Sequence, residues 1–168
     1  MFSHAPADYV CPFCSIVSQC KSADIEESQN AIVYHNDIVT VLVPLHYFAN
    51  IKGNVIMIPN EHYENIFDID YGLGSELLRV TQLIAFAMKA AYNCEGISTR
   101  QHNEPAGNQD AWHYHLHVFP RYNKDQLYLG ARARYEQEER LYHADLLRQN
   151  IKHSRFGIEM PKHRRLSG

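Results

Sequence analysis

The alternation of apolar and polar residues along the chain predicts several short strands grouped around one long helix. Residues 31–43 form two apolar runs separated by a polar segment at 35–37, which is typical of a β-hairpin. Residues 53–59 form an apolar run that ends at a proline, so we expect a buried strand there. Two further strands are predicted at 97–103 and at 113–119, and the second of these alternates strictly.

The longest helical pattern lies between Ser75 and Asn93. Apolar residues recur there at the spacing of one helix face: Leu77, Val80, Ile84, Ala87, Met88 and Ala91. Ser75 is expected to cap the N-terminus, and Gly96 follows as a stop signal. Residues 134–152 are charged with scattered Leu and Tyr, which predicts a second, more exposed helix. Because strands precede and follow the long helix, the pattern predicts an α+β domain with a mostly antiparallel sheet.

The composition is that of an ordinary soluble globular protein, and 168 residues predict a single domain over 1–168. The net charge of -3 gives no general attraction to nucleic acid or to an anionic membrane. No stretch approaches the ~20 apolar residues that span a bilayer. Residues 1–8 lack the basic cluster and apolar run of a secretory leader. We therefore expect a cytoplasmic protein that binds neither nucleic acid nor membrane.

Eleven histidines are many for this length, and His113, His115 and His117 alternate along one predicted strand. Successive side chains of a strand point to opposite faces, so these imidazoles would share one face at intervals of roughly 6.6 Å. A polar, solvent-facing strand or a plain three-histidine metal site would have the same pattern. The loop at 103–109 favours a ligand site, because it can present amides and backbone N–H groups to the row.

Cys11 and Cys14 are separated by two residues near the start of the chain. In the reducing compartment that we expect, such a pair indicates metal binding or redox chemistry rather than a structural disulfide. The pair supplies only half of a zinc site, and two buried free thiols are the alternative.

The motif Gln109-x-x-x-His113-x-His115-x-His117-x-x-Pro120-Arg121 resembles the signature of the histidine triad (HIT) superfamily. The resemblance extends from Cys11 to about Tyr122 and includes Ile58-Pro59-x-x-His62. It implies the HIT-like fold, with one long helix and a C-terminal helix. It further implies a core at about 10–122, a C-terminal extension at about 123–168, and a homodimer.

The resemblance also implies chemistry at the α-phosphorus of a purine nucleotide or nucleotide conjugate. His115 would be the nucleophile and would form a nucleotidyl-histidine intermediate that water hydrolyses. An acceptor such as a backbone carbonyl must hold one ring nitrogen protonated, so that the other nitrogen attacks. His117 would neutralise phosphate charge, and His113 completes the triad. Donors to the phosphate would come from Gln109, Asn103 and Asn108.

In the zinc-bearing branch of the family, two cysteines at this spacing join a histidine after the Ile-Pro strand and the first histidine of the triad. The matching residues here are Cys11, Cys14, His62 and His113. A closed Cys2His2 set is typical of structural zinc, so the resemblance implies one structural Zn2+ per chain and no organic cofactor. Such a site would pin the N-terminal segment to the strand that carries His115.

Two departures from the family pattern leave the substrate open. Asn54 stands where many relatives have a histidine, and the position that often carries a ribose-binding acid falls near His46. The base pocket should be apolar, and Ile16, Tyr34 or Phe48 are either its walls or simply core residues.

The predicted function is hydrolysis of a nucleoside phosphoramidate or of a dinucleoside polyphosphate. The alternatives are a nucleotidyl transferase, a non-catalytic nucleotide-binding or regulatory module, and a zinc-stabilised interaction protein with an incidental histidine row.

Overall fold

A five-stranded antiparallel sheet forms the centre of the fold in the computed structural model, which describes residues 2–18 and 22–153. Each neighbouring pair of strands is antiparallel, which confirms the predicted α+β class. The strands lie in the order β1 (Ile32–His35), β2 (Val39–Leu42), β4 (Val55–Pro59), β6 (Leu116–Arg121) and β5 (Gly96–Gln101).

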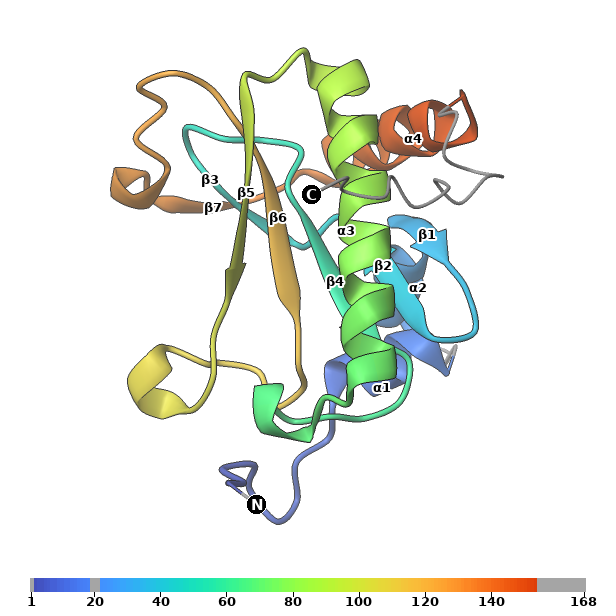
Figure 1. Cartoon of the computed structure of the whole chain (residues 1–168), viewed down its shortest axis with the longest axis vertical. Helices are drawn as coiled ribbons and strands as arrows, with labels where there is room; N and C mark the ends of the chain where they lie inside the picture. The colour runs from blue at the N-terminus through green and yellow to red at the C-terminus, as the bar shows by residue number, and fades with distance from the viewer. Residues whose placement is uncertain (1, 19–21, 154–168) are drawn as a thin grey trace, which may run out of the picture.

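The two faces of this sheet are covered by different elements (Figure 1). The long helix α3 (Tyr71–Tyr92) lies on one face, and α4 (Gln137–His153) packs against α3 and β1. Two short helices, α1 (Pro12–Val17) and α2 (Ala23–Asn30), cover part of the other face. Strand β4 shows the alternation, because Val55 and Met57 join the core under α3 while Ile56 and Ile58 pack with Ile16.

A second, two-stranded sheet pairs β3 (His46–Phe48) with β7 (Arg132–Arg134). In Figure 1 this small sheet lies on the opposite side of the main sheet from α3. Phe48 packs there with Ile51, Phe119 and Leu127. The C-terminal extension thus returns to the sheet through β7 before it forms α4.

The start of α3 corrects one prediction. The helix begins at Tyr71, and the Asp70 carboxylate caps it by accepting a 2.8 Å hydrogen bond from the Leu73 N–H. Ser75 is therefore not the cap; its hydroxyl donates to the Tyr71 carbonyl inside the first turns. Gly72 and Gly74 are weak helix formers and hid this first turn from the sequence pattern.

The end of α3 and the strand limits also differ from the predictions. Asn93, with φ 48°, ends the helix in the left-handed region, and Gly96 instead begins β5. The predicted strand at 113–119 begins only at Leu116. Within residues 2–18 and 22–153, no helix is long and apolar enough to cross a membrane.

Gly53 fixes the start of β4 against the helical layer. Its φ is +81°, and a Cβ there would lie 2.5 Å from the Tyr92 ring. Its N–H donates a 2.8 Å hydrogen bond to the Tyr135 hydroxyl. Only glycine meets both the dihedral angle and the close contact, so the backbone at the start of β4 depends on this residue.

We predict that Gly53→Ala lowers the free energy of unfolding by about 2–4 kcal/mol. The alanine backbone is strained at this positive φ, and the added methyl group displaces the Tyr92 ring. Urea denaturation of both proteins measures the change. Gly107→Ala is the control, because its φ is not positive and a Cβ there meets no atom within 4 Å. Equal losses in the two variants would show that the Gly53 backbone is not the cause.

Candidate functional site

His115 is held in a single tautomer by its own backbone. The side chain is only 4% exposed, and its Nδ1 lies 2.9 Å from the His113 carbonyl oxygen. A carbonyl can only accept, so Nδ1 carries the proton and Nε2 keeps its lone pair. The geometry therefore contains the backbone acceptor that a histidine nucleophile requires.

His117 lies beside His115, with the two ring centroids 5.1 Å apart, and it stacks on Phe119. Burial is the main reason that the pKa of His115 is lowered, and the same cause lowers the pKa of His117 to about 3. Both imidazoles are therefore neutral near pH 7. His117 would meet a phosphate as a neutral hydrogen-bonding ring, unless the phosphate charge itself raised its pKa.

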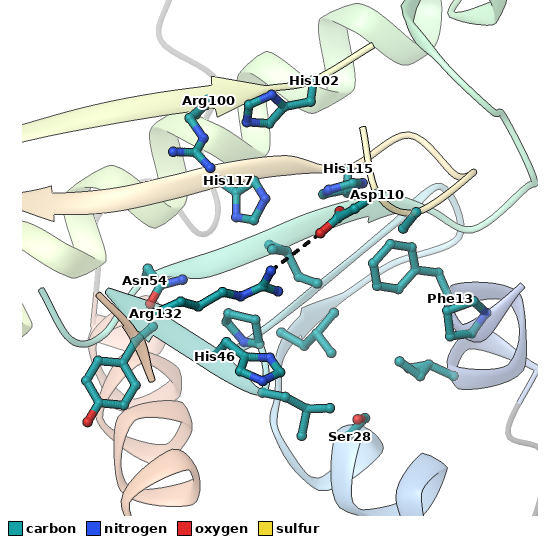
Figure 2. Close-up of a pocket in the computed structure, with 18 of the residues that line it drawn as sticks. Phe13, Ser28, His46, Asn54, Arg100, His102, Asp110, His115, His117 and Arg132 are labelled. Atoms are coloured by element: carbon teal, nitrogen blue, oxygen red, sulfur yellow. Dashed lines mark hydrogen bonds and ion pairs between the residues drawn. The ribbon is translucent and has the colours of Figure 1, made fainter. Parts of the chain in front are cut away.

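A cavity of about 370 Å³ opens in front of these two rings, on the sheet face opposite α3 (Figure 2). This volume suits a small organic ligand. Part of its wall is apolar and comes from Phe13, Ile16, Ile25, Leu42, Pro44 and Ile56. The sequence left Ile16, Tyr34 and Phe48 open as either pocket walls or core residues. Ile16 and Phe48 line the cavity, whereas Tyr34 packs against the core under α3. The small sheet contributes His46 and Arg132 to the wall.

Three buried polar atoms around this cavity have no hydrogen-bond partner: Asn54 Oδ1, His102 Nε2 and His117 Nδ1. Buried polar atoms in native proteins are almost always paired, so three such atoms around one cavity indicate a polar ligand. No motif in the sequence singles out His102. Its Nδ1 contacts the Gly107 carbonyl and must donate to it, so Nε2 is left as an acceptor.

The side-chain amides of Gln109 and Asn103, predicted as donors to a phosphate, make hydrogen bonds to the protein backbone instead. Gln109 Nε2 donates to the carbonyls of Glu64 and Ala111, at 2.6 and 3.0 Å, and its Oε1 accepts from the Glu104 N–H. Asn103 Oδ1 accepts from the Ile66 N–H at 2.8 Å. Both amides brace the loop and do not line the cavity, whereas Asn108 does. Phosphate contacts by Gln109 or Asn103 would require these bonds to exchange.

Cys11, Cys14, His62 and His113 come together at the N-terminal end of α1. Their four ligand atoms all lie within 4.8 Å of one another. The Cys11 Sγ–His113 Nδ1 and Cys14 Sγ–His62 Nδ1 distances are both 3.3 Å. Usual zinc–ligand lengths in a tetrahedral site give S···N separations of about 3.6 Å, so the cluster fits a zinc ion after small adjustments.

The surroundings of His113 also fit a metal ligand. Its Nε2 lies 3.1 Å from the Pro59 carbonyl, so Nε2 donates there and Nδ1 offers its lone pair to the cluster. Burial lowers the pKa of His113 to about 4, which keeps the ring neutral as a metal requires. The side chain of His113 thus belongs to the cluster, and the carbonyl of His113 accepts the hydrogen bond from the His115 ring.

The structure resembles several solved proteins. The Zn-bound histidine triad family protein from Mycobacterium smegmatis is 26% identical, with a TM-score of 0.68 over 84% of this chain and 93% of that one. The Hit-like protein involved in cell-cycle regulation from Bartonella henselae shares the fold at 24% identity. Its TM-score is 0.74 over 88% of this chain and 99% of that one.

The sequence comparisons agree with this fold. The "Protein hit" of Bacillus subtilis is 28% identical over 114 residues, which are 68% of this chain and 72% of that protein. The family model described as HIT domain matches residues 26–124, more than half of the chain. This chain therefore belongs to the HIT domain family.

Proposed function

We propose that this protein is a nucleotide-binding hydrolase that cleaves a nucleoside phosphate derivative at its α-phosphorus through a nucleotidyl-His115 intermediate. The observation that carries the proposal is the hydrogen bond from His115 Nδ1 to the His113 carbonyl. It leaves Nε2 as the nucleophilic nitrogen of a ring that lines the cavity.

The reaction proceeds in two displacements. Nε2 of His115 attacks the α-phosphorus, a P–N bond forms, and the bond to the leaving group breaks with its electron pair on that group, which takes a proton from solvent where it leaves as an amine. Water then attacks the same phosphorus and releases a proton to solvent, the P–N bond breaks with its electron pair on Nε2, and a nucleoside monophosphate leaves while His115 regains its neutral form. A neutral imidazole needs no strong base to begin this sequence, and the burial that lowers the pKa of His115 keeps the ring neutral.

The rest of the cavity supplies complementary contacts for such a substrate. The apolar wall, which includes Phe13 and Ile16, suits a purine base. The unpaired Asn54 Oδ1 can accept a hydrogen bond from a sugar hydroxyl, and His117 lies beside the attacking ring for contact with the phosphate. A non-catalytic nucleotide-binding module is the second candidate, because the loop bonds of Gln109 leave its amide unable to reach a phosphate without rearrangement.

We also propose that the four-residue cluster holds a structural zinc ion. Zinc would supply a structural cross-link at Cys11, Cys14, His62 and His113, a donor set that is typical of structural rather than catalytic sites. The protein's own contribution is to tie α1, through Cys11 and Cys14, to His113, whose carbonyl orients the nucleophile.

His115→Ala is expected to lower AMP release from adenosine phosphoramidate and from diadenosine triphosphate by at least about 1,000-fold, because the nucleophile is lost. Intact-mass analysis of the parent should detect the nucleotidyl adduct, and the variant should not form it. His35→Ala is the control, because His35 lies on β1 and does not line the cavity. Parent-like turnover by His115→Ala rules out the nucleophile, and binding without turnover by the parent favours the regulatory module.

His117 should stay neutral when the pH is lowered from 7.5 to 5, because burial lowers its folded-state pKa to about 3. The unfolded chain takes up this proton near pH 6.5, so folding stability from this group declines as the pH falls from 6.5 toward 3. NMR of histidine-labelled protein, with His117→Gln to assign the resonance, follows the ring directly. Titration of that resonance near pH 6.5 contradicts the prediction.

Purified untagged protein should contain about one zinc per chain by elemental analysis, and a chelator should lower its melting temperature. Cys14→Ser removes one thiolate ligand and should leave less than about a tenth of that zinc content. Cys94→Ser should keep the metal, because Cys94 is a buried thiol outside the cluster. A parent without zinc, or a Cys14→Ser variant that retains it, contradicts the proposed site.

A further inference from the structure

Permanent positive charge in the cavity comes from arginine rather than from the histidine row. Of the described residues that line it, three are arginines and one, Asp110, is a carboxylate. The Arg140 guanidinium already has protein partners. It is 1% exposed and donates to the Val43 carbonyl at 2.9 Å and to Ser28 Oγ at 3.3 Å. Arg100 and Arg132 also line the cavity.

Arg132 comes from the C-terminal extension. It is paired with Phe48 across the small β3–β7 sheet, and its guanidinium reaches over the cavity to Asp110, 3.4 Å away. Figure 2 shows this contact crossing the pocket, with the rings of His115 and His117 on one side of it and His46 on the other. The two charged side chains are 60% and 66% exposed, and such ion pairs contribute little to stability. A phosphate group can therefore replace Asp110 as the partner of Arg132.

Arg100 approaches the same region from the main sheet. It is paired with His117 across β5 and β6, and its guanidinium carbon lies 5.2 Å from the centroid of the Phe48 ring. Phe48 is thus the strand partner of Arg132 and the ring beneath Arg100. Both arginines line the cavity that also contains the His115 and His117 rings.

This arrangement bears on the leaving group. A phosphoramidate releases a neutral amine, whereas a polyphosphate substrate releases a chain that carries negative charge on each further phosphate. Guanidinium groups bind phosphate through paired, charge-assisted hydrogen bonds. We propose that Arg132 binds the leaving phosphate chain and so selects nucleoside or dinucleoside polyphosphates, an inference that rests on the proposed function and specifies its substrate class. The bond that breaks is then the P–O bond to that chain, and its electron pair remains on the departing phosphate oxygen beside Arg132.

The test compares two AMP donors that differ in their leaving groups. Arg132→Ala should lower kcat/KM for diadenosine triphosphate by about 10- to 100-fold, the effect of losing a charge-assisted contact. Its kcat/KM for adenosine phosphoramidate should change by less than about 3-fold. Arg132→Lys keeps the charge without the paired geometry and should recover part of the loss.

Arg134→Ala is the matched control. Arg134 lies on the same strand and is equally exposed, at 60%, but it pairs with Glu27 at 3.7 Å and does not line the cavity. It should leave both activities unchanged. The proposal is overturned if Arg132→Ala affects the two substrates equally, if it affects neither, if Arg134→Ala has the same effect, or if the parent cleaves only the phosphoramidate.

Calorimetry with AMP and ADP separates this inference from the proposed function. A parent that cleaves neither donor disproves hydrolysis. In that case, tighter binding of ADP than of AMP, lost in Arg132→Ala and kept in Arg134→Ala, still supports the role of Arg132 at the second phosphate. Equal binding of AMP and ADP by the parent overturns it.

Discussion

The hydrogen bond between the His113 carbonyl and His115 Nδ1 is the contact on which the candidate site depends. It decides which nitrogen of the buried ring has a lone pair, and that choice cannot be left to solvent because little solvent reaches the ring. The carbonyl is itself held in place, since the side chain of His113 is fixed between the Cys11 thiol and the Pro59 carbonyl. The next residue, Tyr114, donates its N–H to the Tyr63 carbonyl at 2.6 Å. The backbone that leads into His115 is thus anchored at two consecutive residues.

In this cavity His115 and His117 are neutral rings, and the positive charge comes from arginines. Burial favours the neutral imidazole, which is the form that the proposed mechanism requires, but it also prevents His115 and His117 from offering charge to a phosphate. Arginines do not lose their charge in the same setting, because their pKa is far higher. A site that needs both a nucleophile and positive charge therefore benefits from placing them on different residue types and different elements.

The main sheet, the long helix and α4 could be predicted from the sequence because they carry strong local patterns. The patterns of the hairpin at 31–43 and of a strand near Leu116 depend on neighbouring residues only, and the structure contains both elements, although the strand begins at Leu116 rather than at residue 113. The cluster of Cys11, Cys14, His62 and His113 was found through the family resemblance, and the structure brings its ligand atoms together. The homodimer stays a prediction.

The missed features depend on contacts between distant segments. Strands β3 and β7 have three residues each and no alternation long enough to detect, and they pair across a gap of more than 80 residues. His102 gave no signal beyond the histidine excess, because its importance lies in an unpaired nitrogen that only the folded loop creates. The Gln109 amide was expected at the phosphate from its place in the motif, but its bonds to Glu64 and Ala111 depend on the loop conformation.

The small β3–β7 sheet allows the cavity wall to change in evolution independently of the histidine motif. The match to the family ends at residue 124, yet Arg132 beyond that point forms part of the cavity wall. Substitutions in this strand can therefore alter which molecules are accepted while the histidine motif and its anchoring stay intact. Two proteins with identical motifs but different tails would then be expected to diverge in physiological role, and the tail is the segment to exchange when a new preference is sought by directed evolution.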